Sequence, residues 1–296
     1  MKTQNESTST PLSPEQIKFF ADYIEQKLGI IYAKDNYYQL ERRLSDIATT
    51  LGVGSVFELW TKAQTGISGQ FQSLLLDLST NNETSFFRDP GLFKAIEEKI
   101  LVEPRFSGDN PLPLRIWCCA TSTGQEVYSM AILLHSWKLQ NPRRSFSFLA
   151  TDYSLRVLKQ AEEGKYSQLE IQRGLPEAMI NRFFKTEKHM SNPAAATGSW
   201  IVTEELKKGI TFKQQNLLDD FGGIGPFEIV LCRNVLIYQN VENKRRIIAE
   251  IARRLVPGGY LVLGAAESLM GLSEDFEMRQ IDRAVVYQRK QDLKTR

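Results

Sequence analysis

The loop A-T-S-T-G-Q-E at residues 120–126 has the composition of a ligand-binding turn, and it follows the short apolar run Leu114–Cys119. Its small residues allow a ligand to approach the backbone closely, and the helix expected after it presents unpaired N–H groups at its start. The loop has neither the lysine of a triphosphate-binding loop nor the spacing G-x-G-x-x-G. It therefore indicates a nucleotide-type ligand without triphosphate chemistry, or else a tight connection between a strand and a helix.

Two further polar positions follow apolar runs. Asp152 comes after the second run, where an acid can accept hydrogen bonds from both hydroxyls of a ribose. It lies somewhat farther beyond the first loop than the roughly 20 residues usual for such an acid, and capping the helix expected from Ser154 is an alternative role. Asn216 follows the run Ile210–Gln214, with Leu217 beside it, and its amide could read the edge of an adenine.

A fourth apolar run ends in the motif C-R-N-V-L-I-Y at residues 232–238. Arg233 and Asn234 stand where exposed polar groups after a strand would line a crevice. The alternative is an ordinary surface loop. The apolar stretch Val235–Ile237 argues against that alternative, because it would bury the segment.

The segment N-E-T-S-F-F-R at residues 82–88 combines polar residues with a phenylalanine pair. The two rings can pack against a core while Asn82, Thr84 and Arg88 point towards a cleft. Linkers between domains usually carry no such pattern, so we favour a functional role over a simple connection.

These positions share one edge only if the runs before them form a single sheet. From residue 114 onward the apolar runs alternate with helical patterns, which predicts a parallel, doubly wound α/β sheet. Open sheets of this kind bind ligands beyond the carboxyl ends of their strands. The predicted strands are Leu114–Cys119, Phe146–Ala150, Ile210–Gln214, Glu228–Cys232, Tyr260–Leu263 and, after a loop, Ala284–Gln288.

One stretch, residues 185–209, interrupts the alternation. Turn residues at 191–193 (S-N-P) and 197–198 (T-G) separate short runs such as Trp200–Thr203. This pattern predicts a β-hairpin inserted before the third strand of the sheet. A long surface loop is the alternative.

Before residue 80 the pattern is helical throughout. Ser13, Pro14 and Gln16 form a capping box with proline at the first helical position. Two more helical patterns are expected near residues 56–64 and 70–80. The apolar faces of the first two helices comprise Ile17, Phe20, Ala21, Ile24 and Leu28, and Leu40, Leu44, Ile47 and Leu51. The expected divisions are a disordered tail over 1–12, an all-helical domain over 13–80, a linker and connecting helix over 81–100, and an α/β domain over 101–296.

Composition narrows the class of protein. Of 296 residues 42% are hydrophobic and 24% charged, which is ordinary for a globular protein. The net charge of +2 argues against a nucleic-acid partner bound by bulk charge. Two histidines and three cysteines without ligand spacing argue against a metal site and a disulfide framework. No run approaches the roughly 20 apolar residues of a membrane span, and no apolar signal core is present, so we expect a cytoplasmic protein without membrane insertion.

Four ordered motifs resemble the CheR family, the chemotaxis receptor glutamate methyltransferases that use S-adenosylmethionine. They are N-x-T-x-F-F-R from Asn82, R-I-W-x-x-x-x-S-T-G-x-E-x-Y-S from Arg115, A-T-D-Y-S from Ala150 and C-R-N-V-L-I-Y from Cys232. The resemblance runs from about Ser13 to Tyr287. It implies a small all-α N-terminal domain, followed by a Rossmann-like methyltransferase domain with an inserted small antiparallel β-subdomain.

The resemblance also implies roles for individual residues. Asp152 matches the family's ribose-binding acid, and Cys118 and Cys119 stand where small residues are usual. Gln125 replaces a common glutamate. Catalytic roles are implied for Arg88 and Tyr238. Cofactor contacts are implied for Asn82, Thr84, Arg88, Ala120, Glu126, Asp152, Asn216, Leu217, Cys232, Arg233 and Asn234.

The implied reaction transfers a methyl group from S-adenosylmethionine to glutamate carboxylates of chemotaxis receptors, giving methyl esters and S-adenosylhomocysteine. The implied partners are the receptors' cytoplasmic methylation helices and, through the β-subdomain, a receptor C-terminal tail peptide. Arg42 and Arg43 are the implied docking residues, although a solvated helix face is the default interpretation of such charges. The alternatives are a methyltransferase for another substrate and a cofactor-binding signalling module without catalysis.

Overall fold

A computed structural model describes residues 12–107, 113–186 and 199–291 of the chain. The chain divides into two compact units. The first extends to Asn81 and also takes in Tyr238–Asn240, while the second comprises 82–237 and the chain from Val241 onward. Apart from Leu12, the tail predicted over residues 1–12 lies outside the described residues.

The first unit is helical, as the sequence predicts. The capping box is present, because the Ser13 side chain accepts from the Gln16 N–H and the Gln16 side chain accepts from the Ser13 N–H. All five predicted apolar residues of the first helix are buried, whereas in the second helix Ala48 is buried and Leu51 only half-buried. The elements are α1 (Pro14–Leu28), η1 (Lys34–Asn36), α2 (Tyr37–Thr50), α3 (Val56–Gln64) and α4 (Gly69–Ser79).

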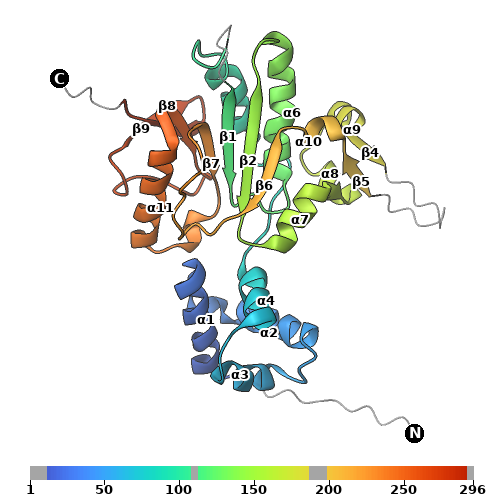
Figure 1. Cartoon of the computed structure of the whole chain (residues 1–296), viewed down its shortest axis with the longest axis vertical. Helices are drawn as coiled ribbons and strands as arrows, with labels where there is room; N and C mark the ends of the chain where they lie inside the picture. Colours follow the sequence, from blue (N-terminus) through green and yellow to red (C-terminus); the bar gives the residue numbers. More distant parts are fainter. Residues whose placement is uncertain (1–11, 108–112, 187–198, 292–296) are drawn as a thin grey trace. The chain divides into compact units, whose positions relative to one another are not determined.

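A seven-stranded sheet in the order β6-β2-β1-β7-β8-β10-β9 forms the centre of the second unit (Figure 1). The first five strands in this order are parallel, but β10 pairs antiparallel with both β8 and β9. The predicted parallel sheet is therefore mixed, and β9 was not predicted. The strands are β1 (Leu114–Cys119), β2 (Phe146–Asp152), β6 (Ile210–Gln214), β7 (Phe227–Cys232), β8 (Leu255–Val262), β9 (Phe276–Ile281) and β10 (Ala284–Arg289).

Helices pack on both faces of this sheet, as the doubly wound prediction requires. Alternate residues of a strand point to opposite faces, so Cys118 belongs to one core with α6, while Trp117 and Cys119 belong to another with α11. Because α6 is covered on nearly all sides, it is apolar around its whole circumference. The helical elements are α5 (Pro90–Ala95), η2 (Ile96–Ile100), α6 (Gln125–Gln140), α7 (Leu155–Glu163), η3 (Leu236–Tyr238) and α11 (Val241–Arg254).

A second, three-stranded antiparallel sheet has the order β3-β5-β4 and lies beside the β6 edge of the large sheet (Figure 1). Strands β4 (Phe184–Thr186) and β5 (Trp200–Val202) pair as the predicted hairpin. The turn residues 191–193 and 197–198 lie outside the described residues. The sequence did not predict β3 (Lys165–Tyr166), because two residues are too few to show an alternating pattern. Three short helices accompany the small sheet: α8 (Gln168–Gln172), α9 (Glu177–Phe183) and α10 (Glu204–Lys207).

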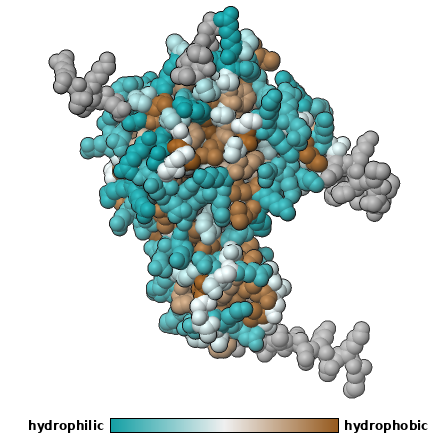
Figure 2. All heavy atoms as spheres, in the orientation of Figure 1, coloured by the Kyte–Doolittle hydropathy of each residue, from teal (hydrophilic) through white to brown (hydrophobic). Residues whose placement is uncertain are grey.

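The surface of the second unit has a strip of hydrophobic residues between two hydrophilic flanks, where strands β2 and β6 run (Figure 2).

Within the described ranges, no helix combines the length and the apolar composition that crossing a bilayer requires.

Candidate functional site

The carboxyl ends of four neighbouring parallel strands lie at one edge of the large sheet. Register pairs Cys119 of β1 with Thr151 of β2 and with Cys232 of β7, and it pairs Asp152 with Gln214 of β6. The polar positions predicted after β1, β2, β6 and β7 therefore follow adjacent strand ends. Such an edge is where open α/β sheets bind ligands.

Strained backbone gathers around this edge. In the described part of the chain, every non-glycine residue with positive φ except Asp282 lies in one of three segments: residues 87–89, the loop after β1, or the loop after β7. The values of φ are 48° for Phe87, 65° for Asp89, 52° for Ala120 and Ser122, and 57° for Asn234. Such conformations persist only where the surrounding structure enforces them, and they concentrate at functional sites.

Asp152 is buried and fixes two loops at once. One carboxylate oxygen accepts a hydrogen bond from the Ser122 N–H at 2.9 Å, and the other accepts from the Ser154 N–H at 3.0 Å. Ser154 itself is the N-cap of α7, so Asp152 does not cap the helix but holds the backbone of the residue that does. An ionised carboxylate can accept about four hydrogen bonds, so holding these two loops is compatible with a contact to a ribose.

The β1 loop has almost no space behind it. Gly124 has a φ of 95°, and a Cβ atom there would lie 2.9 Å from the Ala161 side chain and 3.0 Å from the Tyr166 hydroxyl. That hydroxyl donates to the Thr123 carbonyl at 2.7 Å. Tyr166 of the small sheet therefore supports the loop from behind. No sequence pattern predicted this contact.

The segment of residues 82–88 is anchored at several points. The Ser122 hydroxyl donates to the Asn82 carbonyl at 2.8 Å. As predicted, the phenylalanine rings pack: Phe86 is buried, with its ring centroid 5.0 Å from that of Tyr166, and Phe87 packs edge-on against Phe93. Thr84 is half-buried between these anchors.

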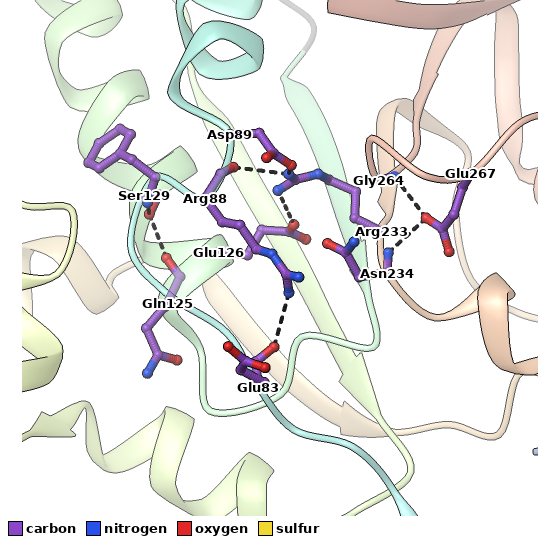
Figure 3. A network of polar contacts seen from close by, with 11 residues as sticks. Glu83, Arg88, Asp89, Gln125, Glu126, Ser129, Arg233, Asn234, Gly264 and Glu267 are labelled. Carbon is purple, nitrogen blue, oxygen red and sulfur yellow. Dashed lines mark hydrogen bonds and ion pairs between the residues drawn. The ribbon is translucent and has the colours of Figure 1, made fainter. Parts of the chain in front are cut away.

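The side chain of Arg88 folds back along this segment. Its Nη1 donates to the Glu83 carbonyl at 3.1 Å, and in Figure 3 its guanidinium lies between Glu83 and Glu126. The half-buried Arg88 side chain thus places a cation at the edge where the predicted ligand loop begins.

Arg233 joins three segments through buried polar contacts (Figure 3). Its side chain is only 2% exposed and forms ion pairs with Glu126 at 2.9 Å and with Asp89 at 2.5 Å. Its Nη2 also donates to the Arg88 carbonyl at 2.9 Å. Arg233 therefore ties the end of β7 to the start of α6 and to the segment before α5.

Burial raises the pKa of the Glu126 carboxyl above its ordinary value, and the guanidinium of Arg233 opposes that shift. Removal of either group would leave the other as a buried charge without this partner, which lowers the stability of the folded protein. Cys232, the residue before Arg233, is buried with its side chain in the α11 core.

Asn216 and Leu217 turn inwards after β6. The Asn216 side-chain oxygen accepts from the Leu218 N–H at 3.0 Å, and Leu217 packs against the α11 core. An adenine at this strand end would therefore meet a turn whose amide oxygen is already engaged by the backbone.

Glu267 was not predicted, although its carboxylate accepts hydrogen bonds from both the loop after β7 and the end of β8 (Figure 3). It lies in the connection after β8 (Leu255–Val262) and not at the strand end, so the strand-end rule did not select it. Asp89 was also missed, because its role depends on Arg233, which is remote in sequence.

Three residues for which the sequence predicts a role, Tyr238, Arg42 and Arg43, belong to the helical unit. The Asn81 side chain donates to the Tyr238 hydroxyl at 2.8 Å, and the Ile31 N–H donates to the Tyr238 carbonyl at 2.9 Å. Arg43 donates to the Ser79 carbonyl at 2.6 Å and stacks near the Tyr32 ring, whereas Arg42 is exposed. Arg43 thus has a structural role inside this unit, and Arg42 is the more accessible of the two.

Comparison with known proteins adds a family. Residues 82–285 match the family model described as CheR methyltransferase, SAM binding domain. The chain is 33% identical to a chemotaxis protein methyltransferase of Vibrio parahaemolyticus over 96% of this chain and 100% of the relative. It is 34% identical to a chemotaxis protein methyltransferase of Pseudomonas putida over 92% of this chain and 96% of that relative.

Proposed function

Because the chain belongs to the CheR methyltransferase family, we propose that it methylates the side-chain carboxylates of specific glutamates on chemotaxis receptors. S-adenosylmethionine supplies a methyl group on a sulfonium, so that a carboxylate oxygen forms the new C–O bond while the departing sulfur keeps the electron pair of the S–CH₃ bond. The observation that carries the proposal is the set of polar segments at adjacent carboxyl ends of β1, β2, β6 and β7. This proposal places the protein in the cytoplasm.

The residues at this edge fit the cofactor. Asp152 ends β2, where an acid can accept hydrogen bonds from ribose hydroxyls, and the small residues from Ala120 onward allow close backbone approach. We assign the amino-acid end of the cofactor to Arg88 and Glu126, whose opposite charges match its carboxylate and ammonium groups. We assign the adenine side to Asn216 and Leu217, with Asn82, Thr84, Cys232, Arg233 and Asn234 completing the cofactor contacts.

The reaction needs no strong base. A glutamate has a reference pKa of about 4.3, so the nucleophile is already ionised at neutral pH. Catalysis then depends on holding the carboxylate and the methyl group in line, and positioning of this kind accounts for a large part of many rate enhancements. We propose that Arg88 steers a carboxylate, and that Tyr238 orients the reacting groups, as its place in the C-R-N-V-L-I-Y motif implies.

Calorimetric titration tests the proposed function. The purified protein is titrated with S-adenosylmethionine and S-adenosylhomocysteine, and with ATP and NAD as nucleotides of other classes. We expect micromolar binding of the sulfonium cofactor and its product alone, followed by transfer of a methyl label to a receptor cytoplasmic fragment as an alkali-labile ester. Binding without transfer would favour a signalling module, and absence of binding would remove the assignment.

The Arg88→Ala variant links this binding to the assigned edge. Removing the guanidinium should lower turnover or cofactor affinity by at least about tenfold, equivalent to about 1.4 kcal/mol. The same titration and label transfer measure the change. Wild-type binding and kinetics in this variant would exclude Arg88 from the site.

Receptor docking is tested on the helical unit by Arg42→Glu. The exposed cation at this position suits an acidic receptor helix, and reversing it should raise the Michaelis constant for receptor by about three- to tenfold. Cofactor affinity should stay unchanged. Arg43 is unsuitable, because its reversal would break contacts inside the unit. Lys62→Glu on α3 is the matched control, and equal effects of the two reversals would contradict docking at Arg42.

A further inference from the structure

A single carboxylate, that of Glu267, accepts hydrogen bonds from five backbone N–H groups. Four of the donors are consecutive: Asn234 at 2.7 Å to Oε2, then Val235 at 2.9 Å, Leu236 at 2.8 Å and Ile237 at 3.3 Å to Oε1. The fifth is Gly264, at 2.7 Å to Oε2. The side chain is half-buried.

The loop after β7 has the geometry of an anion nest, in which successive N–H groups point into one concavity. Asn234 occupies the left-handed region at a φ of 57°, which turns its N–H towards the same point as those that follow. Glu267 supplies the anion from within the chain. Without that carboxylate, the four neighbouring donors would lose the acceptor group that they share, and the strained conformation of Asn234 would lose this support.

The carboxylate is tightly packed on the side of Gly264 and Asn234, while Glu267 also lines an open pocket with Leu236 and Ile237. A Cβ atom on Gly264 would lie 2.6 Å from the Asn234 side-chain nitrogen and 2.8 Å from Oε2 of Glu267. The backbone of Gly264, the Glu267 carboxylate and the Asn234 side chain therefore fit together with no slack. Because Asn234 follows Arg233 at the end of β7, any movement here displaces the segment beside the assigned cofactor contacts.

We propose that Glu267 is a positioning residue for methyl transfer, which holds Asn234–Ile237 in the conformation that the reaction requires. It acts through this loop and has no assigned contact with cofactor or substrate. The inference rests on the proposed function for its catalytic part. Asp152 and the residue 120–126 loop belong to other strand ends, so loosening the β7 loop should affect turnover far more than cofactor binding.

Hydrogen exchange tests, independently of any activity, whether Glu267 clamps the backbone of residues 234–237 in place. Glu267→Gln keeps the size of the side chain, but its NH₂ group faces backbone donors and only one oxygen remains to accept. Amides 234–237 should exchange at least about tenfold faster than in the wild type. Glu274→Gln, the same change at an exposed position of the β8–β9 connection, is the matched control. Unchanged protection of amides 234–237 would overturn the clamp, whether or not the protein is a methyltransferase.

Kinetics test the catalytic part. We expect Glu267→Gln to lower kcat about tenfold or more. The dissociation constant for S-adenosylhomocysteine should rise by a much smaller factor, because Asn234 is the one assigned cofactor contact that Glu267 holds. In Glu267→Ala, added formate or acetate should enter the vacated nest and restore part of the rate in a saturable way. Gly264→Ala, which crowds the same contacts without removing a charge, should also lower kcat.

A purely structural role would give a different pattern. Thermal stability would fall while kcat of the folded protein stayed within about twofold of wild type, and carboxylates would give no rescue. That result would overturn the positioning role. If the wild type bound cofactor but transferred no methyl group, the proposed function would fail, and with it the catalytic part of this inference. The exchange result would still decide the clamp.

Discussion

Replacing Arg233 with methionine is expected to lower the free energy of unfolding of the α/β unit by about 3–5 kcal/mol, the usual cost of breaking a buried ion pair from one side. The Arg233 side chain is 2% exposed and Glu126 12% exposed, so water cannot replace the lost partner. The link between β7, α6 and the segment before α5 would also be lost. Denaturant titration of variant and wild type measures the difference.

Loss of the Arg233 guanidinium should also change how the stability of the variant depends on pH. Burial already raises the pKa of Glu126, and without the guanidinium it should rise further above the value of about 4.3 in the unfolded chain. The folded variant then binds a proton that the unfolded chain releases. Its stability relative to wild type should therefore decrease as pH rises through the raised folded pKa, and recover as pH falls towards the unfolded pKa.

Two controls isolate this effect. The double variant Arg233→Met/Glu126→Gln lacks the buried carboxyl that pairs with Arg233, so the pH dependence of the difference should disappear. Arg173→Met breaks an ion pair with Glu83 in which both side chains are largely exposed, and it should cost less than about 1 kcal/mol. An effect of Arg233→Met as small as that of Arg173→Met would show that the buried network does not stabilise the unit.

Asp152→Asn should weaken binding of S-adenosylhomocysteine about 100-fold, which corresponds to about 2.7 kcal/mol. Each carboxylate oxygen of Asp152 now accepts a backbone N–H, one from Ser122 and one from Ser154. An asparagine supplies one oxygen, while its NH₂ group faces the other donor. The variant therefore disturbs the loop after β1 and also loses charged acceptor positions for the ribose. Calorimetry measures the affinity.

A separate variant tests the N-cap of α7, whose backbone N–H Asp152 holds. Ser154→Ala removes the N-cap acceptor of the Val157 N–H and should cost about 1 kcal/mol of stability. It leaves the Asp152 carboxylate in place, so cofactor affinity should change little. If Asp152→Asn bound S-adenosylhomocysteine within about threefold of wild type, Asp152 would only hold the backbone at Ser122 and Ser154.

The positions assigned to the cofactor depend on groups that belong to other parts of the fold. Tyr166 of the small sheet supports Thr123 in the loop after β1, and its ring packs against Phe86. Glu267 from beyond β8 holds the loop after β7. The inserted β-subdomain therefore helps to hold the loop after β1, which carries assigned cofactor contacts.

The sequence by itself determined the parts whose signals are local. The capping box at Ser13 and the buried face of α1 depend on residues within one helix, so the pattern was sufficient to predict them. The strands β1, β2, β6 and β7 are short segments rich in apolar or β-branched residues, and the rule that ligands bind at strand ends selected Asp152 and Arg233 without any coordinates.

The tertiary structure decided what depends on partners distant in the chain. It made Arg233 the buried link between Glu126 and Asp89, and it placed the Tyr238 contacts in the helical unit. It showed that β10 pairs antiparallel with β8, and it revealed a role of Glu267 that no local sequence pattern indicates. Propensity and periodicity act between residues that are near neighbours in the sequence. Burial and ion pairing instead depend on which distant segments the fold brings together.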